Sequence, residues 1–221
     1  TSNTIICSVN KDGILGDRLR KEGYTVYHRD KRGGLDLSMV KWLREIIARE
    51  QVTVVHAHQY SPMVYSILAT LGNRKCTLIY TEHGRNYPEL FHWKRRLINP
   101  FLALCIDHLV SISHSTRESM IRYDRLPGNR IRVIHNGVDL NRVCGKGDIR
   151  AKRIELGIPD EHRIVGTAAR LEEVKNLPMM LRAFQKIHMD RPDVCLLIAG
   201  TGNLEKSLKD LAHLLGISRN V

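Results

Sequence analysis

The sequence alternates short runs of β-forming residues with amphipathic helical stretches along nearly its whole length. The predicted strands are residues 4–9, 25–28, 52–58, 77–81, 109–113, 131–135, 163–168 and 194–199. Several of these runs are apolar at every position, which is typical of parallel strands covered on both faces. Strands and helices that alternate in this way predict an α/β fold built on doubly wound parallel sheets.

Three of the helices between these strands are recognisable from their apolar faces. The first begins at Asp36 or Ser38, either of which can cap a helix N-terminus. The second begins after Asn176, with Pro178 in its first turn. The apolar faces comprise Val40, Leu43, Ile46 and Ile47 in the first helix, Leu181, Phe184, Ile187 and His188 in the second, and Leu204, Leu208, Leu211, Leu214 and Leu215 in the third. This spacing places each apolar set on one side of its helix.

A polar segment divides the chain into two predicted domains. Asn136-Gly137-Val138-Asp139 is a turn signal, and residues 141–153 after it are largely polar. A new strand–helix series begins near residue 163. We therefore expect one domain over 1–145 and a second over 146–221, the second with only two strands and two full helices, about half of a Rossmann-type domain. A small appendage on a single sheet is the alternative.

Positive charge is concentrated in the first of these domains. Residues 1–146 hold 23 Lys and Arg against 13 Asp and Glu, whereas residues 147–221 hold 12 against 10. A basic surface favours an acidic partner such as nucleic acid, anionic lipid or a phosphate-bearing substrate, although solubility alone also explains it. Aromatic residues make up only 5% of the chain, which argues against a stacking platform for single-stranded nucleic acid.

The sequence predicts neither a membrane span nor a disulfide framework. The longest apolar runs, residues 101–106 and 194–199, are far shorter than the about 20 residues that a spanning helix needs. The five cysteines are scattered singly, with no CxxC spacing. This usage favours a reducing compartment and a cytoplasmic protein.

Polar residues and glycines gather directly after the predicted strands, where open α/β sheets bind their ligands. They are His56 and His58, then Glu82, His83 and Gly84, then Ser113, then Asn136, Gly137 and Asp139, then Arg170, and finally Gly200, Thr201 and Gly202. His56 and His58 share one face of a strand. They lack the carboxylate or third ligand of a metal site, so a hydrogen-bonding pair is favoured, with His58 at the cleft.

Arg170 and Lys175 lie in the loop before the helix that carries Pro178. Both can project over the helix N-terminus, whose dipole also favours anions, and together they can hold a diphosphate. Two ordinary surface cations are the alternative. Gly200-Thr201-Gly202 begins like a GxGxxG turn, but Glu205 replaces the third glycine, so a plain strand-to-helix turn remains open beside a phosphate-binding one.

Six ordered segments resemble family-4 glycosyltransferases of the GT-B fold. They are residues 55–58 (VHAH), 81–84 (TEHG), 110–113 (VSIS), 133–139 (VIHNGVD), 165–171 (VGTAARL) with Lys175-Asn176, and 198–205 (IAGTGNLE). Bacterial members that build exopolysaccharide and other envelope glycans are the most similar. The resemblance implies two facing Rossmann-like domains, the first binding the acceptor and the second a UDP- or GDP-sugar donor. It also implies transfer with retention of anomeric configuration and without a metal or other cofactor.

The resemblance also assigns residues. Arg170 and Lys175 match the basic pair that holds the donor diphosphate, and His83 matches the histidine beside the reacting sugar carbon. The donor set is completed by Gly137, Gly200, Thr201 and Gly202, and the acceptor cleft by His58, Glu82, Gly84, Ser113, Asn136 and Asp139. A sugar-nucleotide epimerase of the same fold and a non-catalytic module for phosphosugars or nucleic acid are the alternatives. We expect no nucleic-acid partner.

Two features of the family have no counterpart in the sequence. The glycine-rich loop after the first strand is absent, and so is the later pair of glutamates spaced E-x7-E that binds donor sugar and ribose. We therefore expect both domains to be incomplete, the chain to be truncated at both ends, and the 221 residues alone to be inactive.

A cationic and aromatic cluster follows in the first domain, at Trp93, Lys94, Arg95 and Arg96. Such a cluster on a helix can lie on an anionic membrane surface, as in family members with lipid-linked acceptors. An ordinary cationic helix face explains it equally well. The first reading predicts a peripheral protein on the inner face of the cytoplasmic membrane.

Overall fold

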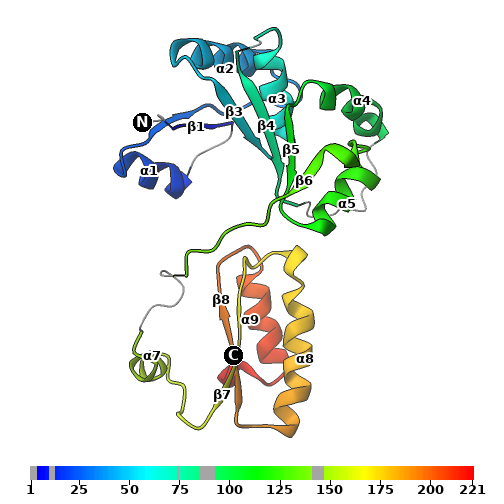
Figure 1. Ribbon diagram of the computed structural model, residues 1–221. Coiled ribbons are helices and arrows are strands. Elements are labelled where there is room, and N and C mark those ends of the chain that lie inside the picture. The colour runs from blue at the N-terminus through cyan, green and yellow to red at the C-terminus, as the bar shows by residue number, and fades with distance from the viewer. Residues whose placement is uncertain (1–3, 10–12, 74, 85–92, 141–146) are drawn as a thin grey trace. The chain divides into compact units, whose positions relative to one another are not determined.

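The computed structural model describes residues 4–9, 13–73, 75–84, 93–140 and 147–221 (Figure 1). The chain forms two compact units, Thr1–Gly137 and Val138–Val221. Both are α/β with parallel strands, which confirms the predicted fold class. The predicted domain boundary after residue 145 lies outside the described residues.

Unit 1 contains a four-stranded parallel sheet in the order β3-β4-β5-β6. The strands are β3 (Val54–His58), β4 (Thr77–Glu82), β5 (His108–Ser111) and β6 (Ile131–Val133). A second parallel sheet pairs β1 (Ile5–Ser8) with β2 (Thr25–His28). Strand β5 ends before the predicted residue 113 because the Ser113 side chain caps the next helix.

The register of the four-stranded sheet separates an apolar face from a polar one. Ala57 pairs with Tyr80, which pairs with Leu109, and all three side chains are buried. The opposite face carries His56, His58 and Thr81, because neighbouring residues of a strand point to opposite sides. The histidines therefore lie on the face away from the main core.

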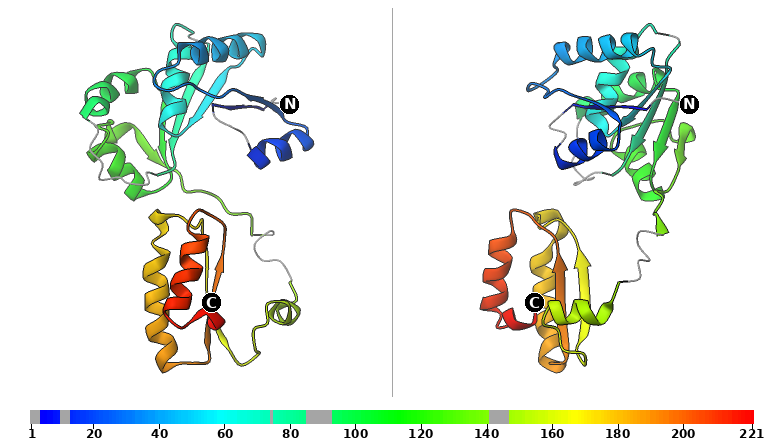
Figure 2. Two further views of the ribbon diagram at one scale, coloured as in Figure 1. Left: turned by 180° about the vertical axis from the view of Figure 1, so that it is seen from behind. Right: turned by 90° about the vertical axis from the view of Figure 1, so that its left-hand side faces the viewer.

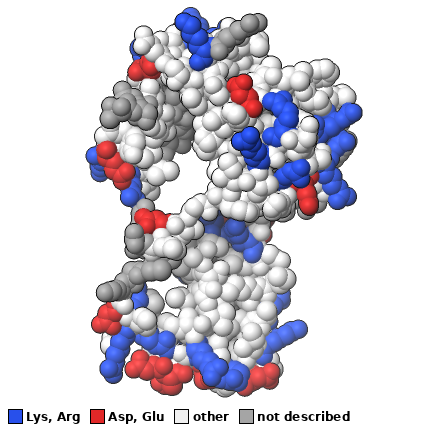
Figure 3. Space-filling model, viewed as in Figure 1, with Lys and Arg blue, Asp and Glu red and all other residues white. Residues whose placement is uncertain are grey.

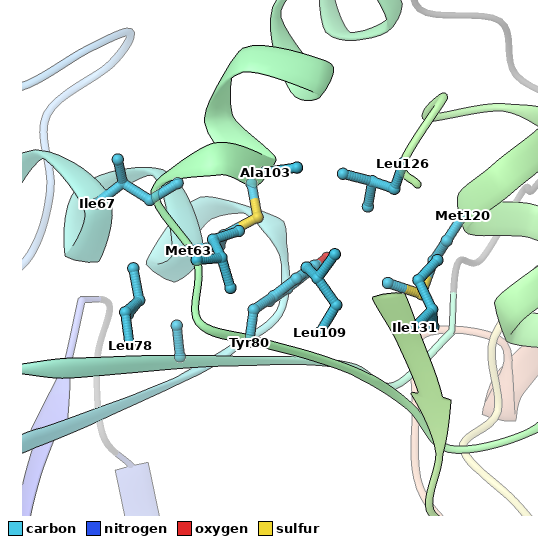
Figure 4. Packing of buried hydrophobic residues seen from close by; sticks show 11 residues of the cluster. Met63, Ile67, Leu78, Tyr80, Ala103, Leu109, Met120, Leu126 and Ile131 are labelled. Atoms are coloured by element: carbon cyan, nitrogen blue, oxygen red, sulfur yellow. The ribbon is translucent and has the colours of Figure 1, made fainter. Parts of the chain in front are cut away.

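Three helices cover the apolar face: α3 (Tyr60–Thr70), α4 (Trp93–Leu104) and α5 (His114–Arg122). Their contact with the strands is shown in Figure 4. The core cluster consists of Ala57, Met63, Ile67, Leu78, Tyr80, Ala103, Ile106, Leu109, Met120, Leu126 and Ile131. This packing fixes the strand ends from which the candidate site is built.

Helix α2 (Leu37–Arg49) packs on α3, as two views of the ribbon show (Figure 2). Asp36 caps it by accepting hydrogen bonds from the Ser38 backbone N–H at 3.0 Å and from the Ser38 hydroxyl at 2.6 Å. These bonds, with one from the Arg32 N–H, lower the pKa of Asp36 to about 2. Of the two predicted caps, Asp36 is the one used. Helix α1 (Gly13–Lys21) lies between β1 and β2 in the sequence.

Unit 2 contains the parallel pair β7 (Arg163–Ala168) and β8 (Val194–Ala199), both with the predicted bounds. Helices α8 (Leu177–Asp190) and α9 (Glu205–Leu214) share one apolar core with these strands, and α7 (Ile149–Glu155) precedes them. The core comprises Leu171, Leu177, Leu181, Phe184, Val194, Leu196, Leu208, Ala212 and Ile217. Leu214, predicted on the apolar face of α9, is 81% exposed because it lies over 90° around the helix from Leu208.

No described helix is long and apolar enough to cross a membrane.

The unit 2 core generates a stability prediction. Leu181 is fully buried at the centre of the cluster, so Leu181→Ala removes apolar contacts and leaves a cavity. We expect a loss of about 2–5 kcal/mol in the free energy of unfolding, measured by denaturant titration. Leu214→Ala is the matched control, since its side chain is exposed, and it should change stability by less than about 0.5 kcal/mol. Equal losses in the two variants would contradict this packing.

Candidate functional site

The carboxyl ends of parallel strands meet at one edge of the unit 1 sheet. His58 ends β3, and it pairs in register with Thr81 of β4, two residues before His83. Ser111 ends β5, two residues before Ser113, and Asn136 follows β6. The structure therefore brings the predicted polar strand ends of this unit to one edge.

Three imidazoles form a row at this edge. The His58 Nδ1 and His83 Nε2 atoms are 2.8 Å apart, and the ring centroids of His56 and His58 are 4.2 Å apart. The His56 Nε2 atom lies 2.8 Å from the Thr81 hydroxyl. Partial desolvation, together with the charge of neighbouring imidazoles, lowers the pKa values of His56 and His58. This environment favours neutral, hydrogen-bonding rings.

Glu82, predicted in the acceptor cleft, is buried and turned into unit 1. Its carboxylate accepts hydrogen bonds from the Tyr80 hydroxyl at 2.5 Å and from the Gly84 backbone N–H at 3.1 Å. Burial and the Glu82 charge raise the pKa of Tyr80, which keeps its phenol a donor. Gly84 has φ +108°, a conformation that L side chains rarely adopt. Glu82 and Gly84 thus shape the turn that presents His83.

The other unit 1 residues of the prediction have simpler surroundings. The Ser113 hydroxyl accepts from the Thr116 N–H at 3.1 Å and so caps α5. Asn136 and Gly137 are exposed after β6, and the exposed Asp139 lies in unit 2. The sequence pattern identified the strand ends, but it did not reveal which side chains are used within the protein.

In unit 2, Arg170 and Lys175 lie in the loop between β7 and α8. The Arg170 guanidinium is exposed and forms an ion pair with Glu172 at 2.9 Å. Lys175 is exposed at the end of a short 3-10 turn. Asn176 then begins α8 in the left-handed conformation and makes no side-chain cap. No side chain caps the first turn of α8, Pro178 has no N–H, and the Met179 N–H donates to the Asn176 carbonyl at 3.1 Å. A helix N-terminus preceded by a loop with two cations is nevertheless an arrangement that suits an anion.

Gly200 and Gly202 support this loop through close backbone packing. A Cβ at Gly200 would overlap the Ala169 carbonyl oxygen, and one at Gly202 would overlap the Leu171 backbone. The loop after β7 is bound to the loop after β8 because the Leu171 N–H donates to the Thr201 carbonyl at 3.0 Å. The buried Leu171 side chain anchors the segment next to Arg170. These glycines therefore position the Arg170 loop, a role that the phosphate-binding interpretation did not foresee.

Within the described ranges, no group of three or more His, Cys, Asp or Glu side chains could hold a metal ion.

Two protein-family models match the sequence, one over each part of the chain. The family model Glycosyltransferase Family 4 matches residues 4–142, well over half of the sequence. The chain belongs to this family. A second model, Glycosyl transferases group 1, matches residues 148–221. Together these matches confirm the resemblance on which the residue assignments depend.

Relatives of known name support the same family. A UDP-Gal:alpha-D-GlcNAc-diphosphoundecaprenol alpha-1,3-galactosyltransferase of Escherichia coli is 26% identical over 185 residues, covering 79% of this chain and 47% of the relative. A D-inositol 3-phosphate glycosyltransferase of Mycobacterium tuberculosis is 40% identical over 97 residues, covering 42% of this chain and 19% of the relative. The chain spans about half or less of the length of the curated relatives it matches.

Solved structures show the same fold. A glycosyltransferase from Rickettsia africae has a TM-score of 0.78 at 19% identity, covering 98% of this chain and 58% of the other. Anabaena Alr3699/HepE, crystallised with UDP and glucose, has a TM-score of 0.79 at 21% identity, covering 97% of this chain and 59% of the other. Both support the GT-B fold for this family member.

The contact between the two unit 2 loops generates the next prediction. Gly202→Ala places a methyl group against the Leu171 backbone, so the Arg170 loop must shift. We expect the free energy of unfolding to fall by about 1–3 kcal/mol, measured by denaturant titration. Gly166→Ala is the matched control, because its added Cβ meets the Leu197 carbonyl oxygen at an ordinary 3.8 Å. Equal stability of the two variants would show that the close approach is absent.

Proposed function

We propose that this chain forms the donor-diphosphate site and acceptor-side edge of a retaining glycosyltransferase, which moves a sugar from a nucleotide-sugar to a saccharide acceptor. The observation that carries the proposal is the Arg170 and Lys175 pair beside the uncapped start of α8. Cleavage of a glycosyl–phosphate bond develops negative charge on the departing diphosphate. Fixed cations and backbone N–H groups stabilise that charge in the transition state.

A UDP-sugar is the proposed donor, with a GDP-sugar as the other possibility. The Anabaena neighbour was crystallised with UDP and glucose, and the Escherichia coli relative is named for UDP-Gal. We propose that no metal is needed, because Arg170 and Lys175 supply positive charge at the diphosphate. His83 completes the proposed catalytic set at the acceptor-side edge, with Gly137, Gly200, Thr201 and Gly202 supporting the donor side.

UDP binding tests the donor site directly. We expect Arg170→Ala and Lys175→Ala each to weaken UDP binding roughly 10- to 100-fold in calorimetry, the cost of losing a hydrogen bond between charged groups. Lys209→Ala is the matched control, since Lys209 pairs with Glu205 on α9. In a transfer assay of the proposed enzyme with both domains complete, the double variant should lose ~100-fold or more in turnover.

Three results would count against this proposal: UDP binding that is unchanged in the double variant, near-normal transfer by that variant, or an equal loss in Lys209→Ala. Preference for nucleic acid over UDP, with a steep dependence on salt, would instead favour the nucleic-acid module.

A lipid-linked acceptor is proposed from the exposed face of α4. Trp93, Leu97, Ile98, Phe101 and Leu104 are all exposed, the last two at 71% and 76%. Their spacing places them on one side of the helix, where Lys94 is the single charge. A continuous apolar helix face with a cation at its start can insert into the headgroup region of a membrane.

The predicted cations of this surface divide into two kinds. The Arg95 guanidinium lies 4.0 Å from the centroid of the Tyr60 ring, and Arg96 donates a hydrogen bond to the Arg122 carbonyl. Both therefore contact other elements of unit 1, whereas Lys94 lies on the exposed face, 5.7 Å from the centroid of the Trp93 ring. Lys and Arg also gather over the region of α4 and α5 in Figure 3. This charge supports an anionic membrane, at the cytoplasmic face, as the surface that α4 contacts.

Vesicle sedimentation tests this surface. A variant with Phe101→Glu and Leu104→Glu should lose binding to vesicles containing anionic phosphatidylglycerol at least about tenfold, because each buried apolar side chain contributes about 1.5–3 kcal/mol. The matched control replaces Ile149 and Ile154 of α7 by Glu, since these residues are similarly exposed at 77% and 74%. Undiminished vesicle binding, with a shift from dimer to monomer in gel filtration, would identify a second copy as the partner of α4.

A further inference from the structure

The histidine row of unit 1 contains more chemistry than the proposed donor site uses. Only His83 has a proposed catalytic role, yet its Nε2 atom lies 2.8 Å from the Nδ1 atom of His58, and the two ring centroids are 5.0 Å apart. His58 is the last residue of β3, and the β3–β4 register sets it opposite Thr81. A rigid element therefore holds the partner of His83.

The hydrogen bond between the two rings limits the protons that they can carry. A ring nitrogen without a hydrogen can only accept, and one with a hydrogen can only donate. One proton must therefore lie between the Nδ1 atom of His58 and the Nε2 atom of His83, and two protons there would break the bond. In a neutral pair the tautomers of the two rings are coupled: when His58 donates, His83 carries its hydrogen on Nδ1, and when His83 donates, its Nδ1 is bare.

The groups around this pair disfavour additional positive charge. The charges that act on His58 come from His56 on the same strand and from His83 after β4, and both lower the pKa of His58 alongside desolvation. Glu82, the carboxylate next to His83, is bonded to the Tyr80 hydroxyl and the Gly84 N–H. Thr81, the remaining partner in the row, is a neutral hydroxyl. Among the described residues, the charges that act on His58 are therefore those of two other imidazoles, and both disfavour its protonation.

We propose that His58 is a positioning residue, which holds the His83 imidazole through their shared hydrogen bond and thereby fixes its orientation and its tautomer. The inference rests on the proposed function, in which His83 lies beside the reacting sugar carbon. A ring nitrogen held in a fixed direction can bond a sugar hydroxyl there, and the tautomer decides whether that nitrogen donates or accepts.

Nitrogen-15 NMR of the histidine rings in the whole chain tests the proposal. Ring nitrogen shifts distinguish the two tautomers, so His83 should show a single tautomer in the wild-type chain. His58→Leu removes the partner atom, and His83 should then show a mixture of both tautomers. His58→Asn puts an amide near the position of Nδ1 and should restore much of the ordering. A merely structural role of His58 would not produce this difference between the two variants.

A pH titration of the His58 ring provides the second measurement. His83→Asn removes one imidazole charge that lowers the pKa of His58, so the midpoint of the His58 titration should move upward. His135→Asn is the matched control, because His135 lies against His114 and the Ile112 carbonyl, outside the row, and should leave the midpoint unchanged. Backbone amide spectra of each variant establish that it is folded.

A tautomer mixture in the wild-type chain would overturn the inference, and so would an unchanged His83 spectrum in folded His58→Leu. UDP binding is measured separately and does not depend on this pair. Ordered His83 without UDP binding would refute the proposed function alone, whereas UDP binding with a disordered His83 would refute the positioning role alone.

Discussion

The parallel pairing of β3, β4, β5 and β6 is the constraint on which the unit 1 site depends. Every strand of this sheet runs in one direction, so every strand delivers its next residues to the same edge. Helices α3, α4 and α5 pack on the apolar face of the sheet, and this core fixes the positions of the strand ends. The positions of the polar side chains at this edge therefore depend on packing elsewhere in unit 1.

Unit 2 also places polar residues at the ends of parallel strands, with two strands instead of four. Two strands, two helices and two close contacts between backbones, at Gly200 and Gly202, hold the loop of Arg170 and Lys175 before α8. The contacts depend on glycine for space, since a methyl group at either position would meet a carbonyl oxygen. A loop that carries cations is thus held by its backbone and by Leu171, while the charged side chains of Arg170 and Lys175 remain exposed.

Sequence periodicity predicted the fold class, all eight strands and the bounds of β2, β7 and β8, because buried parallel strands differ so clearly from their helices. Motif order predicted which residues follow the strands. The sequence pattern did not predict the direction of individual side chains. It does not show that the Glu82 carboxylate accepts from Tyr80 or that Arg95 stacks on Tyr60. Arg95 and Tyr60 are distant in the sequence, whereas Tyr80 and Glu82 lie two residues apart on β4 and both are buried. The sequence pattern also did not predict that β1 and β2 pair in a sheet separate from that of β3 to β6.

The ion pair between Arg170 and Glu172 has a consequence for how any anion arrives. The guanidinium already has a carboxylate partner, so an incoming diphosphate takes the place of one anion instead of filling a bare cationic site. Binding becomes an exchange, and the released Glu172 must find water or another partner. In the proposed donor site, its charge would then oppose the bound phosphate from two residues away, which would ease departure of the product as well as lower affinity. One carboxylate would thus act on both binding and release.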